Sequence, residues 1–232
     1  MRRRRPVPIA TAVAALAAIV LAGTLPAQAS HLPESDAEAL EILSDYYPGY
    51  WWDHTDLTVA VQAAPNVRRT HLTAVHDAID TWDTVLRQEF DDLITLTDIT
   101  GSARNPQRAD IVLHYVPKAG GVAFSGYAIC GEHRCPNIMV RSDFNAGNGR
   151  HPYSPEYLGV ITLHEIGHAL GLGHATNLLE STDLMGYGWS EEVDAVMSDC
   201  DLDALTHIFA WAFEGSEPHR PEATGPYDCS LD

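Results

Sequence analysis

One short segment carries the side chains best suited to chemistry. Residues 164–174 read His-Glu-Ile-Gly-His-Ala-Leu-Gly-Leu-Gly-His. On an α-helix, His164 and His168 lie on one face, about 6 Å apart between Cβ atoms, so one ion can bind both. Gly171 lets the chain leave the helix in left-handed geometry, and the turned chain can bring back His174 as a third nitrogen ligand. Three protein ligands leave the fourth position of a tetrahedral zinc open, which is the catalytic arrangement.

The extended spacing H-E-x-x-H-x-x-G-x-x-H makes this signal specific. The shorter H-E-x-x-H also arises as two core histidines on a helix, whereas the longer form is rarely accidental. Glu165 lies one position round the helix, beside the ion, where a carboxylate can serve as general base. Met185 follows eleven residues after His174. We expect it to pack beneath the histidines, and an ordinary buried methionine is compatible with that place.

With these residues, the chain resembles the metzincin zinc metallopeptidases, and its histidine motif is most similar to the matrixin branch. The resemblance implies that one catalytic Zn²⁺ is bound by three ligands, His164, His168 and His174, and that Glu165 is the general base. Tyr187 departs from the matrixin pattern and is similar to the tyrosine of astacin-like and serralysin-like metzincins. In those branches this tyrosine can contact zinc and swing to the oxyanion, and a plain packing or surface tyrosine is the alternative.

The resemblance extends more weakly over residues 50–213. Trp52 followed by Leu57-Thr58-Val59 is similar to the opening strand of matrixin catalytic domains, and Ala109-Asp110-Ile111 is similar to the start of their third strand. In that family the next strand is the sheet edge that pairs with an extended substrate, and here it corresponds to residues 121–130. The cysteine-containing latency motif and the histidine and aspartate pattern of a second, structural zinc are absent from the sequence.

A polar segment near two glycines suggests a weak Ca²⁺ site. Asp143, Asn145 and Asn148 lie close to Gly147 and Gly149. Because their spacing departs from known calcium loops, a polar loop is the favoured interpretation.

The histidines need a helix that holds them in the interior. Ser154-Pro155 predicts a helix start, with a capping hydroxyl followed by proline at the first helical position. The helix is predicted to run to Leu170, and it is apolar almost all the way round, so it should be buried. A buried helix that carries two histidines and a glutamate needs a reason, and metal ligation is one.

The remaining pattern predicts an α+β fold: a five-stranded mixed twisted sheet, two main helices and a small C-terminal part after Gly171. A long amphipathic helix with Asn66 or Thr70 as N-cap is predicted from apolar residues at helical spacing, and a last helix from residues 201–213. Strands are predicted at residues 57–62, 93–100, 109–116, 121–129 and 137–144. The aromatic cluster at residues 46–52 is expected to pack at the start of the domain, with an exposed recognition patch as the alternative.

The first residues indicate export. Arg2 to Arg5 precede an apolar run, and Ala27-Gln28-Ala29 matches a signal-peptidase site. A transmembrane anchor is the competing interpretation, but the run is shorter than the ~20 residues that a span needs. We therefore expect a secreted protein. We expect four parts: a signal peptide at residues 1–29, a short acidic leader at 30–48, a catalytic domain at 49–214 and a Pro/Gly-rich tail at 215–232.

The net charge narrows the range of binding partners. Removing a signal peptide with four arginines and no acidic residue takes the formal net charge from −18 to −22, which disfavours nucleic acid and anionic membranes as partners.

Four cysteines in an exported chain suggest two disulfides. Cys130 with Cys135 and Cys200 with Cys229 are the favoured pairs, although three pairings are formally possible.

These observations predict a secreted, monomeric zinc endopeptidase that hydrolyses peptide bonds in polypeptide substrates. One alternative is a secreted zinc-binding interaction protein without catalysis, although binding alone does not require Glu165. The other is a zinc amidase acting on a non-peptide amide.

Overall fold

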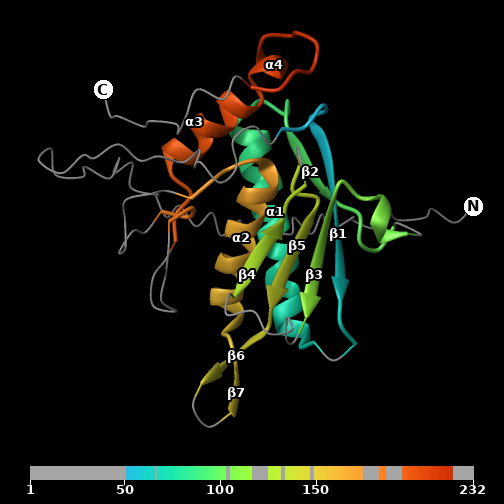
Figure 1. Cartoon of the computed structure of the whole chain (residues 1–232), viewed down its shortest axis with the longest axis vertical. Coiled ribbons are helices and arrows are strands. Elements are labelled where there is room, and N and C mark those ends of the chain that lie inside the picture. Colours follow the sequence, from blue (N-terminus) through green and yellow to red (C-terminus); the bar gives the residue numbers. More distant parts are fainter. Residues whose placement is uncertain are drawn as a thin grey trace, which may run out of the picture. The chain divides into compact units, whose positions relative to one another are not determined.

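A five-stranded mixed sheet is the framework of the chain in the computed structural model (Figure 1). The structure describes residues 51–65, 67–102, 105–116, 125–131, 134–146, 149–174, 183–186 and 195–221. The strands are β1 (Asp56–Ala63), β2 (Thr95–Asp98), β3 (Ile111–Val116), β4 (Gly126–Ile129) and β5 (Asn137–Arg141). Their order is β2-β1-β3-β5-β4, and only β4 runs antiparallel to its neighbour. The predicted mixed sheet of five strands is confirmed.

Alternation along the strands places one face of the sheet in the core. Val59 and Val61 of β1 are in register with Ile111 and Leu113 of β3, and all four are buried. Successive side chains of a strand point to opposite faces, so these residues share one face. The half-buried Thr58 and Gln62 of β1 lie on the other face, as the pattern in the sequence predicts.

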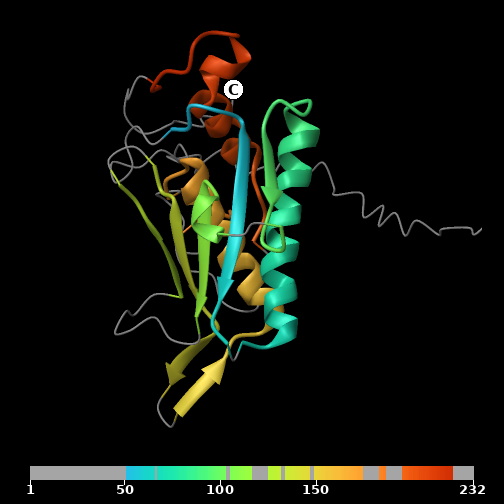
Figure 2. The same cartoon turned by 90° about the vertical axis from the view of Figure 1, so that its right-hand side faces the viewer.

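Helix α1 (Arg69–Glu89) lies along the buried face of the sheet (Figure 2). Its N-cap is Arg68, which makes no side-chain capping bond, so the predicted caps Asn66 and Thr70 are wrong. Burial of its apolar stripe, rather than a polar cap, stabilises this helix, because most helical stability in proteins comes from such packing. Trp82 belongs to that stripe, and its indole N–H donates to Leu163 O of the next helix at 2.8 Å.

Helix α2 (Pro155–Leu170) begins and ends as predicted. The Ser154 hydroxyl accepts a hydrogen bond from Tyr157 N at 3.1 Å, and Pro155 occupies the first turn. Gly171 ends the helix in the left-handed region, with φ of 116°. The turn is closed by Leu172 N–H, which donates to Gly167 O at 3.0 Å. This turn sets the direction in which the chain leaves the helix.

Two elements differ from the predictions made from the sequence. The predicted strand at residues 137–144 is interrupted at Ser142. β5 ends at Arg141, and a separate antiparallel pair follows, β6 (Asp143–Ala146) with β7 (Gly149–Pro152). The last helix begins earlier and breaks at Phe209, giving α3 (Asp199–Ile208) and α4 (Ala210–Phe213).

One of the two predicted disulfides is confirmed, and several other predictions concern residues outside those that the structure describes. Cys130 and Cys135 are bonded, and the part of the chain that the structure describes holds no free cysteine. Cys229, the expected partner of Cys200, lies outside the described residues, as do the signal peptide and the leader. Trp52, at the end of the aromatic cluster, is buried as expected. No described helix is both long and apolar enough to cross a membrane.

Candidate metal centre

The three histidines of the motif converge. His164 and His168 lie one turn apart on α2, with ring centroids 4.5 Å apart. The turn at Gly171 brings His174 to 5.1 Å from the first ring and 4.5 Å from the second, again between centroids. One potential ligand atom from each residue lies within 4.8 Å of the other two. The structure therefore brings together all three predicted ligands.

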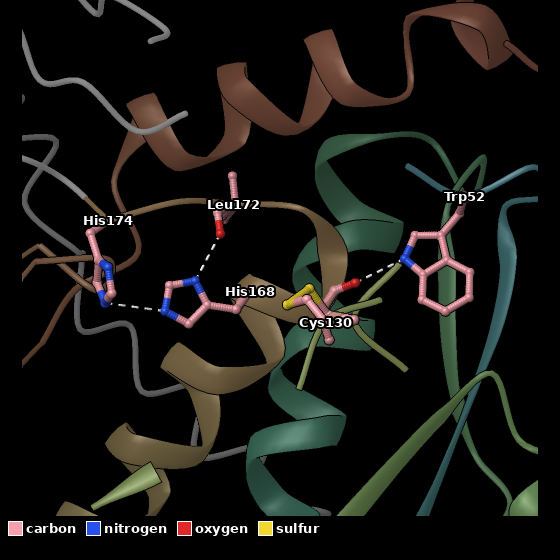
Figure 3. The surroundings of a disulfide bond; sticks show 7 residues. Trp52, Cys130, His168, Leu172 and His174 are labelled. Atoms are coloured by element: carbon pink, nitrogen blue, oxygen red, sulfur yellow. Dashed lines mark hydrogen bonds between the residues drawn. A yellow bond between two sulfur atoms is a disulfide. The ribbon is translucent and has the colours of Figure 1, made fainter. Parts of the chain in front are cut away.

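Backbone carbonyls hold two of these rings. His164 Nδ1–H donates to Leu184 O at 2.7 Å. His168 Nδ1–H donates to Leu172 O at 2.8 Å (Figure 3). A ring that donates from Nδ1 in its neutral form has a lone pair on Nε2, the atom that binds a metal. The sequence motif identified the rings but not these carbonyls, which come from the segments that follow the helix.

Burial keeps the imidazoles uncharged. Desolvation lowers the pKa of His168 to about 4 and the pKa of His174 to about 3, and the neighbouring His168 adds to the effect on His174. The pKa of His164 is lowered well below its ordinary value, mainly by burial and then by His168. Neutral imidazole is the ligand form, so the cluster is ready for a cation near neutral pH.

The spacing of the nitrogens fits zinc. His168 Nε2 and His174 Nε2 lie 3.2 Å apart. Two nitrogens bound to one tetrahedral zinc at about 2.0–2.1 Å lie about 3.3 Å from each other. Three imidazoles without a protein carboxylate in the set also match the donors that zinc accepts in catalytic sites. The residues present therefore fit a three-histidine zinc site.

Glu165 is buried beside this cluster. The residue is 5% exposed, and burial raises the pKa of its carboxyl group to about 8. Oε2 has no hydrogen-bond partner among the described residues. A buried carboxyl that has a pKa near neutrality and adjoins a metal site is suited to taking up and releasing a proton.

Met185 packs against α2 beneath the histidines, as expected. It is fully buried, and a methyl group at Gly167 would lie 2.5 Å from its Sδ atom and 3.2 Å from its Cε atom. Gly167 lies between the two helical ligands in the sequence, so only a residue without a side chain permits this approach. The neighbouring Leu184 supplies the carbonyl that holds His164. The same short segment thus fills the space under the helix and orients one of the three histidines.

A buried pair of acids anchors that segment, and sequence reasoning missed it. Asp183 Oδ1 accepts from Met185 N at 2.7 Å, and Asp201 Oδ2 accepts from Ser198 N at 2.9 Å. Asp201 is fully buried, and its Oδ1 has no hydrogen-bond partner among the described residues. Burial first, and then the charge of Asp183, raises the pKa of Asp201 well above its ordinary value. The pKa of Asp183 is also raised by burial. The Ser-x-x-Asp spacing of a capping box was the available signal.

We expect Asp201→Asn to stabilise the zinc-loaded protein above neutral pH. The folded protein holds protons on these acids more tightly than the unfolded chain, so its stability falls as the pH rises from about 4 through the raised pKa values. The amide carries no charge, and its oxygen can still accept from Ser198 N. The free energy of unfolding at pH 8 should rise by about 1 kcal/mol, the scale set by an unsatisfied buried polar group. Denaturant unfolding between pH 4 and pH 8 measures this.

The exposed Asp203→Asn substitution on the same helix is the matched control. Its unfolding free energy should follow the wild-type pH dependence within about 0.5 kcal/mol. An Asp201→Asn protein with the wild-type pH dependence would show that the acids do not share a raised affinity for protons.

Contacts around the disulfide support the end of α2. The Trp52 indole N–H donates to Ala169 O, next to His168 in the sequence, at 2.9 Å (Figure 3). Arg134, inside the disulfide loop, lies 5.2 Å from the Trp52 ring and forms an ion pair with Asp53 at 2.6 Å. The loop, the start of the domain and the ligand helix are therefore packed together.

The other predicted sites are outside the cluster or outside the described residues. Tyr187, proposed as a catalytic residue, lies outside the described residues, so its role stays a prediction. Asp143 and Asn145 of the calcium hypothesis belong to β6, and Asn148 lies outside the described residues. Outside the cluster, His76 of α1 pairs with Asp98 at 2.5 Å.

No known protein family matches this chain, and no curated protein matches it significantly.

Proposed function

We propose that the chain is a secreted zinc-dependent endopeptidase of the metzincin type. The observation that carries the proposal is the convergence of three neutral imidazoles, from His164, His168 and His174, beside a buried carboxyl group on the same helix. The metzincin assignment adds the motif spacing and Met185, which lies under the ligand helix as that family would require.

In the proposed reaction, each residue of the chain has a distinct task. A zinc ion bound there would supply Lewis acidity and a water of lowered pKa, the chemistry that peptide hydrolysis needs. Glu165 takes a proton from the attacking water and delivers it to the leaving amine. Leu172 O and Leu184 O hold His168 and His164 in one orientation throughout. Burial of the site excludes bulk water, which strengthens these electrostatic interactions.

The edge of the sheet suggests how a peptide would be held. β4 is the last strand in the order of the sheet, and on its outer side it pairs with no other strand of the described residues. An extended peptide can add to such an edge through backbone hydrogen bonds. Glu165 lies against Gly126 of this strand, so a peptide seated there would lie close to the proposed base. A polypeptide is therefore the proposed substrate.

Other features bear on secretion and on the two alternative functions. The signal peptide proposed at residues 1–29 agrees with the disulfide between Cys130 and Cys135, since such bonds persist mainly outside the cytosol. A zinc-binding interaction protein has no need to bury Glu165 next to the ligands, because a buried carboxyl carries a desolvation penalty. An amidase with a non-peptide substrate remains the second candidate within the same chemistry.

Digestion of a peptide library by the mature chain, residues 30–232, tests the proposal. We expect cleavage that a chelator abolishes and added zinc restores, with about one zinc per chain by metal analysis. Cleavage of peptides separates an endopeptidase from an amidase. A zinc-loaded chain that leaves the whole library intact overturns the proposed activity, and a chain that binds no zinc overturns the site.

A further inference from the structure

We infer that Gly126 is a positioning residue for Glu165: the missing side chain lets the edge strand β4 pack directly on the carboxyl group and fixes where that group lies. The inference rests on the proposed function, since Glu165 matters to catalysis only if the chain is a hydrolase.

The contact leaves no room for a side chain at Gly126 unless Glu165 moves. A methyl group at Gly126 would lie 2.6 Å from Glu165 Oε1, 2.8 Å from Cγ and 2.9 Å from Cδ. Non-bonded carbon atoms pack at about 3.5–4.0 Å, so all three atoms would overlap with the methyl group. The whole end of the glutamate side chain therefore lies against the backbone of the strand.

The strand cannot move away easily to make room. β4 is paired with β5 along its length, with Gly126 in register with Val140. Just before the strand, Ser125 O accepts from Arg141 N at 2.9 Å, and the Ser125 hydroxyl is hydrogen-bonded to the Tyr153 hydroxyl at 2.6 Å. A displacement of β4 at Gly126 would break these bonds, so an added methyl group should displace Glu165 instead.

Packing against β4 restrains the glutamate side chain. Its Oε2 atom is buried without a hydrogen-bond partner among the described residues. Trp82 and Trp52 donate hydrogen bonds to carbonyls of the helix on either side of Glu165 in the sequence, so the backbone at Glu165 is held in place. The surface of β4 lies against Oε1, Cγ and Cδ of Glu165, so it restricts the side-chain rotamer. A shift of about 1 Å in a catalytic group can lower a rate on the order of 100-fold.

The first test compares Gly126→Ala with Gly131→Ala in the zinc-loaded mature chain. At Gly131 a methyl group would have only an ordinary contact, 3.7 Å from Arg134 O, so this variant controls for the loss of glycine. We expect Gly126→Ala to lower kcat on the order of 100-fold, with an unchanged zinc content and a KM within about threefold of wild type, whereas Gly131→Ala keeps wild-type kinetics. Equal kinetics in the two variants would overturn the inference.

The second test removes one methylene from the base. Glu165→Asp draws the carboxyl group back from β4 and should slow wild type strongly. In the Gly126→Ala background the same change should be much less harmful, because the shorter side chain makes room for the methyl group. We therefore expect the loss of kcat in the double variant to be smaller than the product of the two single losses. If Gly126→Ala only weakened the strand, the two effects would be additive in free energy, and that result overturns the inference.

A crystal structure and a folding assay test the inference without measuring catalytic turnover. In a crystal structure of Gly126→Ala, the Glu165 carboxyl should be displaced while the three histidine rings stay in place, and an undisturbed carboxyl overturns the inference. If the Gly126→Ala protein fails to fold, we expect the Gly126→Ala/Glu165→Asp double variant to fold, because the shorter side chain makes room for the methyl group. A double variant that also fails to fold overturns the inference. A zinc-loaded wild type without hydrolysis would instead defeat the proposed function, so the two failures are distinguishable.

Discussion

Glu165→Gln is expected to lower peptide hydrolysis by about 10²–10⁴-fold while the zinc content stays at the wild-type level. Glutamine has nearly the same shape as glutamate, so it keeps the packing against Gly126, but its amide cannot accept a proton from water. None of the three ligand nitrogens belongs to this residue. Initial rates on a peptide substrate, measured beside metal analysis of the same samples, test the expectation.

Glu156→Gln is the matched control for this variant. Glu156 lies in the first turn of the same helix and is exposed, so its amide should leave both rate and zinc content unchanged. A Glu165→Gln protein with full activity would contradict the assignment of a general base. Loss of zinc from that protein would contradict the assignment of the three histidines as the whole set of protein ligands.

Gly167→Ala is expected to destabilise the protein by about 1–3 kcal/mol, the range for overpacking a tight core. Alanine normally stabilises a helix interior relative to glycine by about 1 kcal/mol, so a loss isolates the overlap with Met185. Because Leu184 O holds His164, a shift of this segment should also weaken zinc binding. Denaturant unfolding and zinc titration measure the two effects.

Gly159→Ala on the same helix is the control, since its methyl group would lie 3.8 Å from Ala74 O. It should be neutral or slightly stabilising. Met185→Ala alone should cost about 2–5 kcal/mol through the cavity that it leaves. In the Gly167→Ala/Met185→Ala double variant the new methyl group fills part of this space, so the losses should not add. Equal stability of Gly167→Ala and Gly159→Ala would refute the proposed contact.

Local signals made the ligand helix predictable. Ser154-Pro155 and Gly171 act within one turn of their own positions, so the bounds of α2 follow from the sequence. The three histidines lie within one helix and its closing turn, and fixed helical geometry is enough to bring them together. The order of strands and helices likewise predicted the α+β class with its five-stranded sheet.

Contacts between distant segments were not predictable in this way. Gly126 and Glu165 are far apart in the sequence, and no local pattern pairs a strand glycine with a helix glutamate. Asp183 and Asp201 are likewise joined only by the fold. The hairpin of β6 and β7 does have a local signal in the sequence, since Gly147-Asn148, between Ala146 and Gly149, is a dipeptide typical of two-residue hairpin loops. The interpretation of this segment as a polar or calcium loop did not use that signal.

The partners of His164 and His168 are peptide oxygens, and this has an electrostatic consequence. Many metal-binding histidines donate to a carboxylate, which makes the ring a stronger electron donor and offsets part of the ion's charge. Leu172 and Leu184 contribute only dipoles, and no side-chain substitution at either residue can remove them. Two carbonyl dipoles would offset less of the charge of a divalent ion at this centre than two carboxylates would, and Glu165 is the acidic residue nearest to the histidines in the sequence of α2. Such an electrophilic centre should favour anionic, oxygen-donating inhibitors over neutral ones.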